Sequence, residues 1–532
     1  MPTQAPTRVL CLGGGWVALQ LARSLSRAVA RGEVQLTIIS RENYQTTHGL
    51  IAEMITSKVQ PQQILTSVRR LVPEGSLCNA EIERIDMAER VVHTRRELDG
   101  HRYSHGFDHL VVGVGSVDDL SRYPGIAEHA FALKSYAGCV RLRHHLLTMI
   151  ELAQFERDPA ERRRLLTFVV AGGNYAGVEV ACDLVDYFRL LTRRAYQAVP
   201  AEEIRVVLVE IGERILPELG TRQPRLIEFA EKRIAELGIE VKLGAGIAAA
   251  TGTEASLTTG ERVPSRTIIT CTGMAPSPLL EQLPYARDRR GRLEVDEFMR
   301  VPGAENVWAA GDCAAAPHPE GGTCPPLALY AQRGGALAGA NILRVLAGRR
   351  LKAFSFSGLG EACTLGHGSA VAYLKGIRVT GWLAWIGWRA IIWSMFVPAW
   401  DRKVRLLADW LLTACLGRDV VNPRIEGRHE VSQAWFEAGQ VILSPGEPSL
   451  FHYVVQTGEV EVLTDGAADI LRAGTVFCDD LSTERRATVR ARSRVRLLAV
   501  EKSAAAAVVA ARPDVAALLS VPAAEPEITA RP

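Results

Sequence analysis

Hydrophobic positions form the same pattern at two places in the chain: a short buried strand, a glycine-rich turn, and an amphipathic helix. The two segments are VLCLGGGWVALQLA, residues 9–22, and FVVAGGNYAGVEVA, residues 168–181. Such a turn leaves backbone N–H groups at the start of the helix, where they can bind a pyrophosphate. The pattern predicts an α/β fold with two Rossmann-like dinucleotide-binding domains. Two dinucleotides with their reactive rings brought together would serve electron transfer.

The first turn fits the dinucleotide-binding pattern G-x-G-x-x-[GA] through Gly13, Gly15 and Ala18. Gly13 permits the sharp turn, and Gly15 lets the backbone approach the phosphates. Ala18 adds only a methyl group where the helix packs on the strand. Because this turn lies between a strand and a helix, we expect it to bind a dinucleotide.

The strand that follows, residues 34–40, should end in an acidic residue that binds the ribose hydroxyl groups. It ends instead in Ser40 and Arg41, and Glu42 comes next. A serine and an arginine would suit the 2′-phosphate of NADP, so an NADP site is the alternative for this turn.

A later segment decides between the two cofactors. Residues 291–317, GRLEVDEFMRVPGAENVWAAGDCAAAP, contain an apolar strand followed by Gly311 and Asp312. This aspartate is placed to contact the ribityl and pyrophosphate part of a flavin. We therefore assign FAD to the first site, with Glu42 or Ser40 on its adenosine ribose.

The second turn carries Gly172, Asn174 and Gly177, so that asparagine replaces the middle glycine. Asparagine tolerates a left-handed backbone, so the turn can keep its shape. The next strand ends in Glu210, which can bind the 2′-hydroxyl of an adenosine ribose and would repel a 2′-phosphate. The second site is expected to bind NADH, with Gly273 near the nicotinamide half. The alternative for Glu210 is a solvated strand end.

Composition limits the other possibilities. A chain of 532 residues is long enough for three or four domains, and a net charge of +3 does not indicate nucleic acid as a partner. No uncharged apolar run reaches the roughly 18 residues that would span a bilayer, and we recognise no secretory signal or metal-ligand cluster. The ten cysteines include no C-x-x-C pair. HGLIAEMITSKV, where flavoprotein disulfide reductases hold their redox cysteines, contains none.

Several segments, taken in order, resemble type II NADH dehydrogenases, the single-chain NADH:quinone oxidoreductases that pump no protons. The segments are RENYQTTHGLIAEMIT, FDHLVVGVGS, FALKSYAGCVRLRHHL, GVEVACDL, VVLVEIGERILPEL, NVWAAGDCAAAP and CPPLALYAQRGGALAGANI. The resemblance implies hydride transfer from NADH to FAD and then transfer of two electrons to a membrane quinone. It implies that Gly115 belongs to the cofactor site and that Glu179 acts between nicotinamide, flavin and acceptor. The alternative for Glu179 is a carboxylate stabilised by the helix dipole.

The chain departs from the family on the quinone side. The family has A-Q-x-A-x-Q-x-G, whereas residues 328–335 read ALYAQRGG. Leu329 and Arg333 take the two glutamine positions, and Gln332 is shifted by one. Leucine cannot hydrogen-bond a quinone carbonyl, whereas arginine could stabilise the oxyanion of a reduced quinone. An acceptor other than the usual quinone is the alternative.

Six of the nine tryptophans lie between residues 382 and 410, which predicts a membrane-facing stretch over 380–416. On a helix over 380–397, one broad face would carry Trp382, Trp385, Trp388, Ile392, Trp393 and Phe396. The protein body would contact the small residues Ala384, Gly387, Ala390 and Ser394. Pro398 ends this helix, and the cations that follow, which would attract anionic lipid, are Arg402, Lys403 and Arg405. Arg389 favours a helix that lies in the interface over one that crosses the membrane. A core helix or a dimer contact is the alternative.

After residue 425 the sequence changes to short β-like runs separated by glycine and proline, which predicts an all-β domain. Residues 435–463 and 474–500 resemble two parts of a cyclic-nucleotide-binding jelly-roll domain. The resemblance places Asp479 and Arg485 where that family binds the ribose and the cyclic phosphate. Because Cys478 replaces a glycine and a short segment is missing, a degenerate packing or dimerisation module is favoured over a ligand-binding one.

The sequence thus predicts five parts: an FAD domain (1–160 and 289–345), an NAD domain inserted in it (161–288), an amphipathic region (346–425), a β-domain (426–512) and a disordered tail (513–532). The main hypothesis is an NADH:quinone oxidoreductase, bound peripherally to the cytoplasmic face of the cell membrane. One alternative is a soluble NAD(P)H reductase that passes electrons to a protein carrier. The other is a nucleotide or redox sensor without turnover. A homodimer is one possible assembly.

Overall fold

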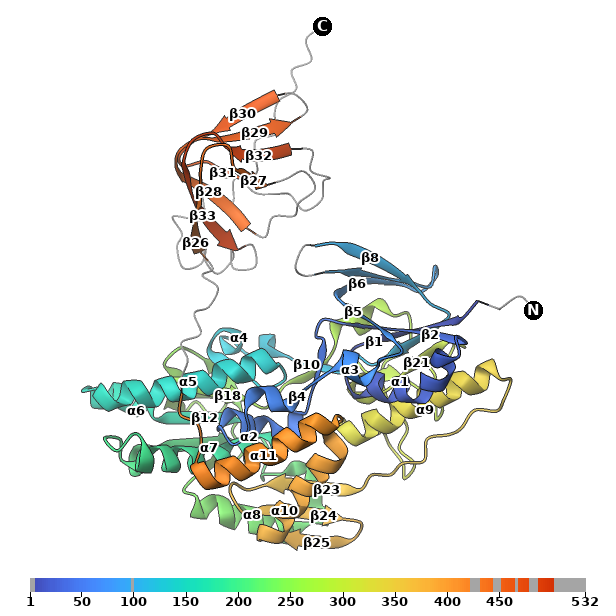
Figure 1. Cartoon of the computed structure of the whole chain (residues 1–532). Coiled ribbons are helices and arrows are strands. Elements are labelled where there is room, and N and C mark those ends of the chain that lie inside the picture. Colours follow the sequence, from blue (N-terminus) through green and yellow to red (C-terminus); the bar gives the residue numbers. More distant parts are fainter. Residues whose placement is uncertain are drawn as a thin grey trace. The chain divides into compact units, whose positions relative to one another are not determined.

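A computed structural model describes residues 5–96, 100–421, 431–443, 451–464, 467–477 and 487–501 (Figure 1). The chain divides into two compact units, residues 1–94 with 104–423 and residues 95–103 with 424–532. The first unit is α/β and contains two five-stranded parallel sheets, and the second contains two antiparallel sheets. The predicted fold class is confirmed.

The first sheet is parallel, with the strand order β21-β9-β1-β2-β5. Its strands are β1 (Thr7–Leu12), β2 (Val34–Ser40), β5 (Ser76–Asn79), β9 (His109–Val112) and β21 (Val307–Ala309). Helices α1 (Trp16–Ala30) and α9 (Ala328–Leu346) pack closely against each other. Glycine makes this possible, because a Cβ atom added to Gly335 would collide with the backbone of Val17.

The second sheet is also parallel, with the order β11-β18-β12-β13-β14. Its strands are β11 (Ala130–Ala132), β12 (Thr167–Ala171), β13 (Arg205–Val209), β14 (Glu240–Lys242) and β18 (Thr267–Thr270). The helices α5 (Tyr136–Phe155), α7 (Tyr175–Arg194) and α8 (Pro224–Glu236) belong to this half of the unit. β11 comes before residue 160, yet it pairs with β18 of the inserted domain.

A three-stranded antiparallel sheet and two helices follow α9. The strands are β23 (Gly360–Thr364), β24 (Ala370–Leu374) and β25 (Ile377–Thr380). The helices are α10 (Gly381–Ile391), which continues as a π-helical turn over Ile392–Phe396, and α11 (Trp400–Leu416). Within the described parts of the chain, no helix is both long and apolar enough to cross a membrane.

The predicted tryptophan face of α10 is wrong in its orientation. Trp385 and Trp388 are only 7% exposed and pack into the protein, whereas Trp382 is 61% exposed. The small residues divide likewise: Ala384 is buried, but Ala390 and Ser394 are exposed. The reason is that the helix turns its tryptophans toward a buried ion pair and a cavity, described below, which periodicity alone could not reveal. The exposed apolar side chains of α10 and α11 are Trp382, Leu383, Ile386, Trp400, Val404, Leu407, Leu411, Leu412 and Leu416.

Two of the three cations expected to face lipid are hydrogen-bonded to backbone carbonyls at the surface. Arg402 donates from Nη1 to the backbone carbonyl of Gln62 at 3.1 Å, and Lys403 donates from Nζ to the carbonyl of Ser394 at 2.8 Å. Arg405 is exposed. A hydrogen bond to a neutral carbonyl leaves the charge of the cation in place, so the three side chains keep this surface basic.

The second unit contains two four-stranded antiparallel sheets, with the orders β26-β33-β28-β31 and β27-β32-β29-β30. Its strands are β26 (Val431–Phe436), β27 (Val441–Leu443), β28 (Phe451–Thr457), β29 (Val460–Thr464), β30 (Ala467–Leu471), β31 (Val476–Phe477), β32 (Ala487–Ala491) and β33 (Val495–Glu501). Its core includes Val455, Val460 and Leu497. Asp479 and Arg485 lie outside the described residues.

Candidate active site

A cavity of about 1010 Å³ opens at the carboxyl ends of the first sheet. Part of its lining comes from segments that directly follow four strands: Gly13–Trp16 after β1, Arg41 and Glu42 after β2, 113–117 after β9, and 310–312 after β21. Parallel α/β sheets bind ligands at this edge. Another part of the lining comes from the start of α9, from β23 and from α10, and it includes Leu329, Ala362, Trp388, Ile391, Ile392 and Phe396.

The first glycine-rich turn has the geometry of a phosphate cradle. Gly13 has a φ of +98°, and a Cβ atom there would collide with the carbonyl of Gly113. Gly15 is different, because a Cβ atom added to it meets nothing within 4 Å. The N-terminus of α1 has no side-chain cap, so its first N–H groups remain available to an anion. Ala18 is fully buried, as expected for the contact between helix and strand.

The remaining residues assigned to FAD also line the cavity. Ser40, Glu42, Gly115 and Asp312 all belong to the lining, and Gly311 adopts a φ of +77° that presents Asp312. Asp312 accepts a hydrogen bond from the hydroxyl of Ser116 at 2.9 Å, and its Oδ2 lies 3.5 Å from Nζ of Lys134. An open cradle at one turn and a carboxylate at the end of β21 fit the pyrophosphate and ribityl parts of a flavin nucleotide.

The second turn does not rely on a left-handed asparagine, as was expected. Gly172 has a φ of +111°, but Asn174 is extended, with φ −73° and ψ 179°. Its side chain caps α7 instead, because Oδ1 accepts from the N–H of Gly177 at 3.0 Å and Nδ2 donates to the carbonyl of Cys271 at 2.7 Å. Asparagine is therefore present as an N-cap rather than as a left-handed residue.

Glu210 is a buried carboxylate fixed at the end of β13. Its Oε2 accepts from the N–H of Gly173 at 2.6 Å, and its Oε1 accepts from the N–H of Gly212 at 2.7 Å. The side chain therefore joins the second turn to the loop after β13. Each carboxylate oxygen has a further lone pair, so a ribose hydroxyl can still bind. The alternative interpretation of Glu210 as a solvated strand end is therefore wrong, because the side chain is buried and hydrogen-bonded.

The first residue of α7 connects the second turn with the cavity. Tyr175 follows Asn174 and lines the cavity, and its hydroxyl donates to Oε2 of Glu361 at 2.9 Å. Gly273 has a φ of +81° and its carbonyl accepts from the N–H of Asp119 at 2.6 Å, outside the cavity lining. The first turn thus lines the cavity, whereas the second turn is connected to it only through the adjoining Tyr175.

Glu179 lies one helical turn after Tyr175 on α7. Its Oε1 accepts from the backbone N–H of Thr364 at 3.0 Å, which ties it to β23. Burial raises the pKa of this carboxyl to about 8, and the nearby carboxylates of Asp183 and Glu53 add to the rise. Glu179 therefore holds a proton at neutral pH, and it can release one close to the cavity.

The residues expected on the acceptor side are separated. Leu329 lines the cavity. Gln332 donates from Nε2 to the carbonyl of Met395 at 3.4 Å, and the guanidinium of Arg333 lies exposed, 5.4 Å from the centre of the Phe356 ring. Neither Gln332 nor Arg333 contributes to the cavity lining.

Residues 7–335 match the family described as pyridine nucleotide-disulphide oxidoreductases, and residues 433–512 match the cyclic nucleotide-binding domain. The chain belongs to the pyridine nucleotide-disulphide oxidoreductase family. The second match confirms the resemblance of the β-domain.

The chain is also similar to named relatives and to solved structures. A type II NADH:quinone oxidoreductase of Mycobacterium tuberculosis is 27% identical over 433 residues, which cover 77% of this chain and 90% of that protein. An NADH dehydrogenase-like protein of the same organism is 32% identical over 378 residues, covering 70% and 88%. The structure of NDH2 from Plasmodium falciparum in complex with NADH has the same fold, with a TM-score of 0.71 and 15% identity over 78% of this chain and 99% of that chain. The resemblance to type II NADH dehydrogenases is confirmed.

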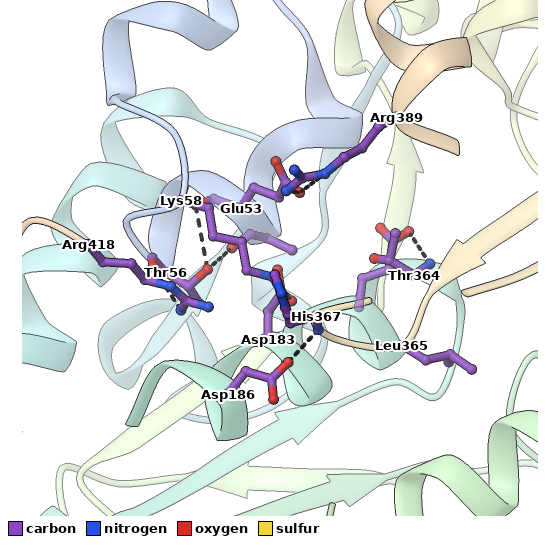
Figure 2. Close-up of polar contacts among 12 residues, drawn as sticks. Glu53, Thr56, Lys58, Asp183, Asp186, Thr364, Leu365, His367, Arg389 and Arg418 are labelled. Atoms are coloured by element: carbon purple, nitrogen blue, oxygen red, sulfur yellow. Dashed lines mark hydrogen bonds and ion pairs between the residues drawn. The ribbon is translucent and has the colours of Figure 1, made fainter. Parts of the chain in front are cut away.

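Some residues of the site were missed from the sequence. Lys134, Ser116 and His48 line the cavity beside Asp312. A polar cluster next to Glu179 was missed as well, including the buried ion pair of Lys58 with Asp183 (Figure 2). A lysine within a largely apolar segment was the available signal, but its partner lies 125 residues away and no local pattern identifies it.

Proposed function

We propose that the first unit is an NADH:quinone oxidoreductase that transfers a hydride from NADH to bound FAD and then two electrons to a membrane quinone, without pumping protons. The observation that carries the proposal is that one cavity begins at the Gly13–Gly15 cradle and is also lined by Trp388 of α10 and by Ile392 and Phe396 of the turn that follows it. The first residues of α10 carry exposed apolar side chains. An apolar acceptor would therefore enter from the side of α10. The names of the relatives support the same reaction.

The cradles support the assignment of the two nucleotides. FAD, when bound, supplies the redox chemistry, and the protein holds and orients it. Gly13, Gly15 and Asp312 would hold its pyrophosphate and ribityl parts, with Ser40 or Glu42 on the adenosine ribose. Glu210 would bind the 2′-hydroxyl of NADH, and its charge would repel the 2′-phosphate of NADPH. We further propose that Glu179 acts at the acceptor end.

We propose peripheral binding to the cytoplasmic face of the cell membrane, and the exposed apolar side chains of α10 and α11 support the contact with a membrane. Trp400 is 71% exposed and Leu416 78% exposed, and Leu407 and Leu411 lie one turn apart on α11. Exposed apolar patches of this kind mark interaction surfaces, and tryptophan prefers the headgroup region of a bilayer.

An acceptor panel tests the reaction. Purified protein should be yellow, should oxidise NADH faster than NADPH, and should reduce a short-chain quinone. A colourless protein that does not take up FAD would contradict the assignment. Turnover with a protein carrier but not with quinones would favour the soluble reductase, and no turnover with any acceptor would favour the sensor.

Vesicle binding tests the membrane surface. Leu407→Ser combined with Leu411→Ser should weaken sedimentation with anionic phospholipid vesicles about tenfold or more, because two exposed leucines lose contact with lipid. Phe155→Ser is the matched control, since Phe155 on α5 is 83% exposed but lies on another helix. Unchanged sedimentation would contradict lipid binding, and a loss of dimers in light scattering would indicate that a second copy covers this surface. Truncation before residue 380 is unsuitable, because it would remove Trp388 from the cavity wall.

For the second unit, we propose a packing or dimerisation module rather than a nucleotide receptor. Arg485→Ala should then leave the NADH:quinone rate unchanged, with or without added cyclic nucleotide. A cyclic-nucleotide response that this change abolishes would restore the ligand-binding interpretation.

A further inference from the structure

The loop that follows β13 lies against the second glycine-rich turn. The backbone N–H of Leu216 in this loop donates to the carbonyl of Gly173 in the turn at 2.7 Å. Leu216 is fully buried and has a left-handed backbone, with φ 51° and ψ 54°, which residues other than glycine rarely adopt. Glu218 follows two residues later. The loop is therefore fixed in a shape that brings Glu218 close to the second turn.

The carboxyl group of Glu218 lies beside the first backbone N–H of α7, which belongs to Tyr175. The surrounding protein raises the pKa of Glu218 by desolvation, and the charges of Glu361 and Glu210 add to the rise. The backbone N–H groups of Glu218 and Tyr175 act in the opposite direction, because they stabilise the carboxylate. The first N–H groups of a helix attract anions in general. The start of α7 thus already has a carboxylate of the protein beside it.

Other N–H groups of the second turn also bind side chains of the protein. The N–H of Gly173 donates to Oε2 of Glu210 at 2.6 Å, and the N–H of Gly177 donates to Oδ1 of Asn174 at 3.0 Å. The first turn is different, because α1 has no side-chain cap at its N-terminus. The second turn is therefore partly occupied by oxygen atoms of its own chain before any dinucleotide binds.

The surroundings of the second turn are acidic. Glu361 on β23 accepts from the hydroxyl of Tyr175 at 2.9 Å, so that Glu210, Glu218 and Glu361 all lie near the start of α7. Within the described part of the chain, no lysine or arginine forms an ion pair with any of these carboxyl groups. A pyrophosphate is negatively charged on both phosphates. It would therefore meet like charge at this turn, and no ion-paired cation there offsets the repulsion.

Glu218 can leave its position without a movement of the loop. Its side chain is exposed, whereas Leu216, which fixes the loop, is fully buried. A rotation of the Glu218 side chain toward water would free the N–H of Tyr175 for another acceptor. A pyrophosphate at the start of a helix accepts hydrogen bonds from N–H groups of this kind. The carboxylate and the pyrophosphate thus compete for the same place.

We propose that Glu218 competes with the pyrophosphate of the dinucleotide for the start of α7 and so sets the affinity of the second turn for NADH. The inference rests on the proposed function, because it takes the second turn as the NADH site. In the free protein the carboxylate of Glu218 lies beside the N–H of Tyr175. When NADH binds, its pyrophosphate takes that N–H and the carboxylate turns into water. Glu218 therefore weakens NADH binding and takes no part in hydride transfer.

The test measures binding of ADP-ribose, which carries the pyrophosphate but no nicotinamide, to the full-length, flavin-loaded protein by titration calorimetry. Glu218→Gln keeps an oxygen for the N–H of Tyr175 but removes the charge. The dissociation constant of ADP-ribose should therefore fall about tenfold. With a short-chain quinone as acceptor, KM for NADH should fall by a similar factor, while kcat stays within about twofold of wild type. Glu228→Gln, which changes an exposed carboxylate on α8, is the control and should alter none of these values.

Each outcome decides the inference. An unchanged or higher dissociation constant for ADP-ribose in Glu218→Gln would overturn it. An equal gain in Glu228→Gln would also overturn it, because the effect would then come from net charge alone. If Glu218→Gln does not fold, Glu218→Ser carries the test with the same expected gain, since a hydroxyl oxygen can accept from an N–H group. Failure of the wild-type protein to bind ADP-ribose would instead contradict the proposed NADH site.

Discussion

The guanidinium of Arg389 forms an ion pair with Glu53 at 2.5 Å, and this pair joins α10 to α2 (Ile51–Ile55). The guanidinium lies 4.1 Å from the ring centre of Trp385 and 4.6 Å from that of Trp410. Trp410 also donates from Nε1 to Oε2 of Glu53 at 2.7 Å. Arg389, which interrupts the apolar sequence of α10, therefore connects this helix to α2 through its ion pair.

Removing this cation should destabilise the first unit. Arg389→Met leaves the carboxylate of Glu53 buried without its partner, which costs about 3–5 kcal/mol. Adding Glu53→Gln should recover part of that loss, because the uncompensated charge disappears. Urea unfolding of the two variants measures the difference. Equal stability of the single and double variants would contradict the assigned role of Glu53.

Glu210 should control the choice between nucleotides. Glu210→Gln keeps an oxygen for one of the two loop N–H groups but removes the charge that repels a 2′-phosphate. Because a hydrogen bond to a charged group contributes about 1.5–3 kcal/mol, the ratio of kcat/KM for NADH to that for NADPH should fall about 10- to 100-fold. Steady-state kinetics with both donors checks this. A ratio that does not change would show that another residue selects the donor.

Substitutions of Gly13 and Gly15 in the first turn should have different effects, one on stability and the other on flavin binding. Gly15→Val should fold but bind flavin weakly, because a Cβ atom there meets no protein atom within 4 Å and Gly15 lines the cavity at the phosphate cradle. Overpacking of about 1–3 kcal/mol corresponds to roughly 5- to 150-fold in flavin affinity. Gly13→Ala should destabilise the turn itself, since its φ is positive and the Cβ atom would collide with Gly113.

Flavin content and the unfolding transition separate these two effects. Gly387→Val is the control, because a Cβ atom there also meets nothing within 4 Å. If Gly15→Val retained its full flavin content, the cradle would have to lie elsewhere.

Glu179 should make stability depend on pH. Its folded pKa of about 8 lies above the ordinary value of 4.5, chiefly because the carboxyl is buried. Between these values the folded state binds more protons than the unfolded state, so stability falls as pH rises from about 4.5 to 8. Glu179→Gln removes this dependence. The variant should therefore gain stability relative to wild type, by a few kcal/mol at pH 8 and much less at pH 5. Parallel pH dependence of both proteins in urea unfolding would contradict the raised pKa.

Much of the fold could be predicted because its signals are local. A strand, a turn and a helix in sequence specify each cradle, and Gly13, Gly15 and Asp312 line the cavity as expected. Asn174 shows a limit of this reasoning. The same residue type serves as a left-handed position or as an N-cap, and only the neighbouring N–H of Gly177 decides which.

Contacts between distant segments could not be predicted. Trp385 and Trp388 satisfy the periodicity of a lipid-facing stripe, yet α10 turns them inward because Glu53, more than 300 residues earlier, offers a partner for Arg389. The pair of Lys58 and Asp183 is similar, since each residue resembles an ordinary surface charge until the segment after α2 packs against α7.

The placement of Trp388 has a consequence for how this protein can change over time. Trp382, which is exposed, and Trp388, which lines the cavity, lie six residues apart on α10, about 9 Å along the helix axis. The exposed surface and the cavity wall therefore belong to the same helix. A substitution that shifts or tilts this helix would move the exposed surface and the cavity wall together. Change in this helix is therefore limited from two sides, by the cavity that it helps to enclose and by the apolar surface that it presents outside.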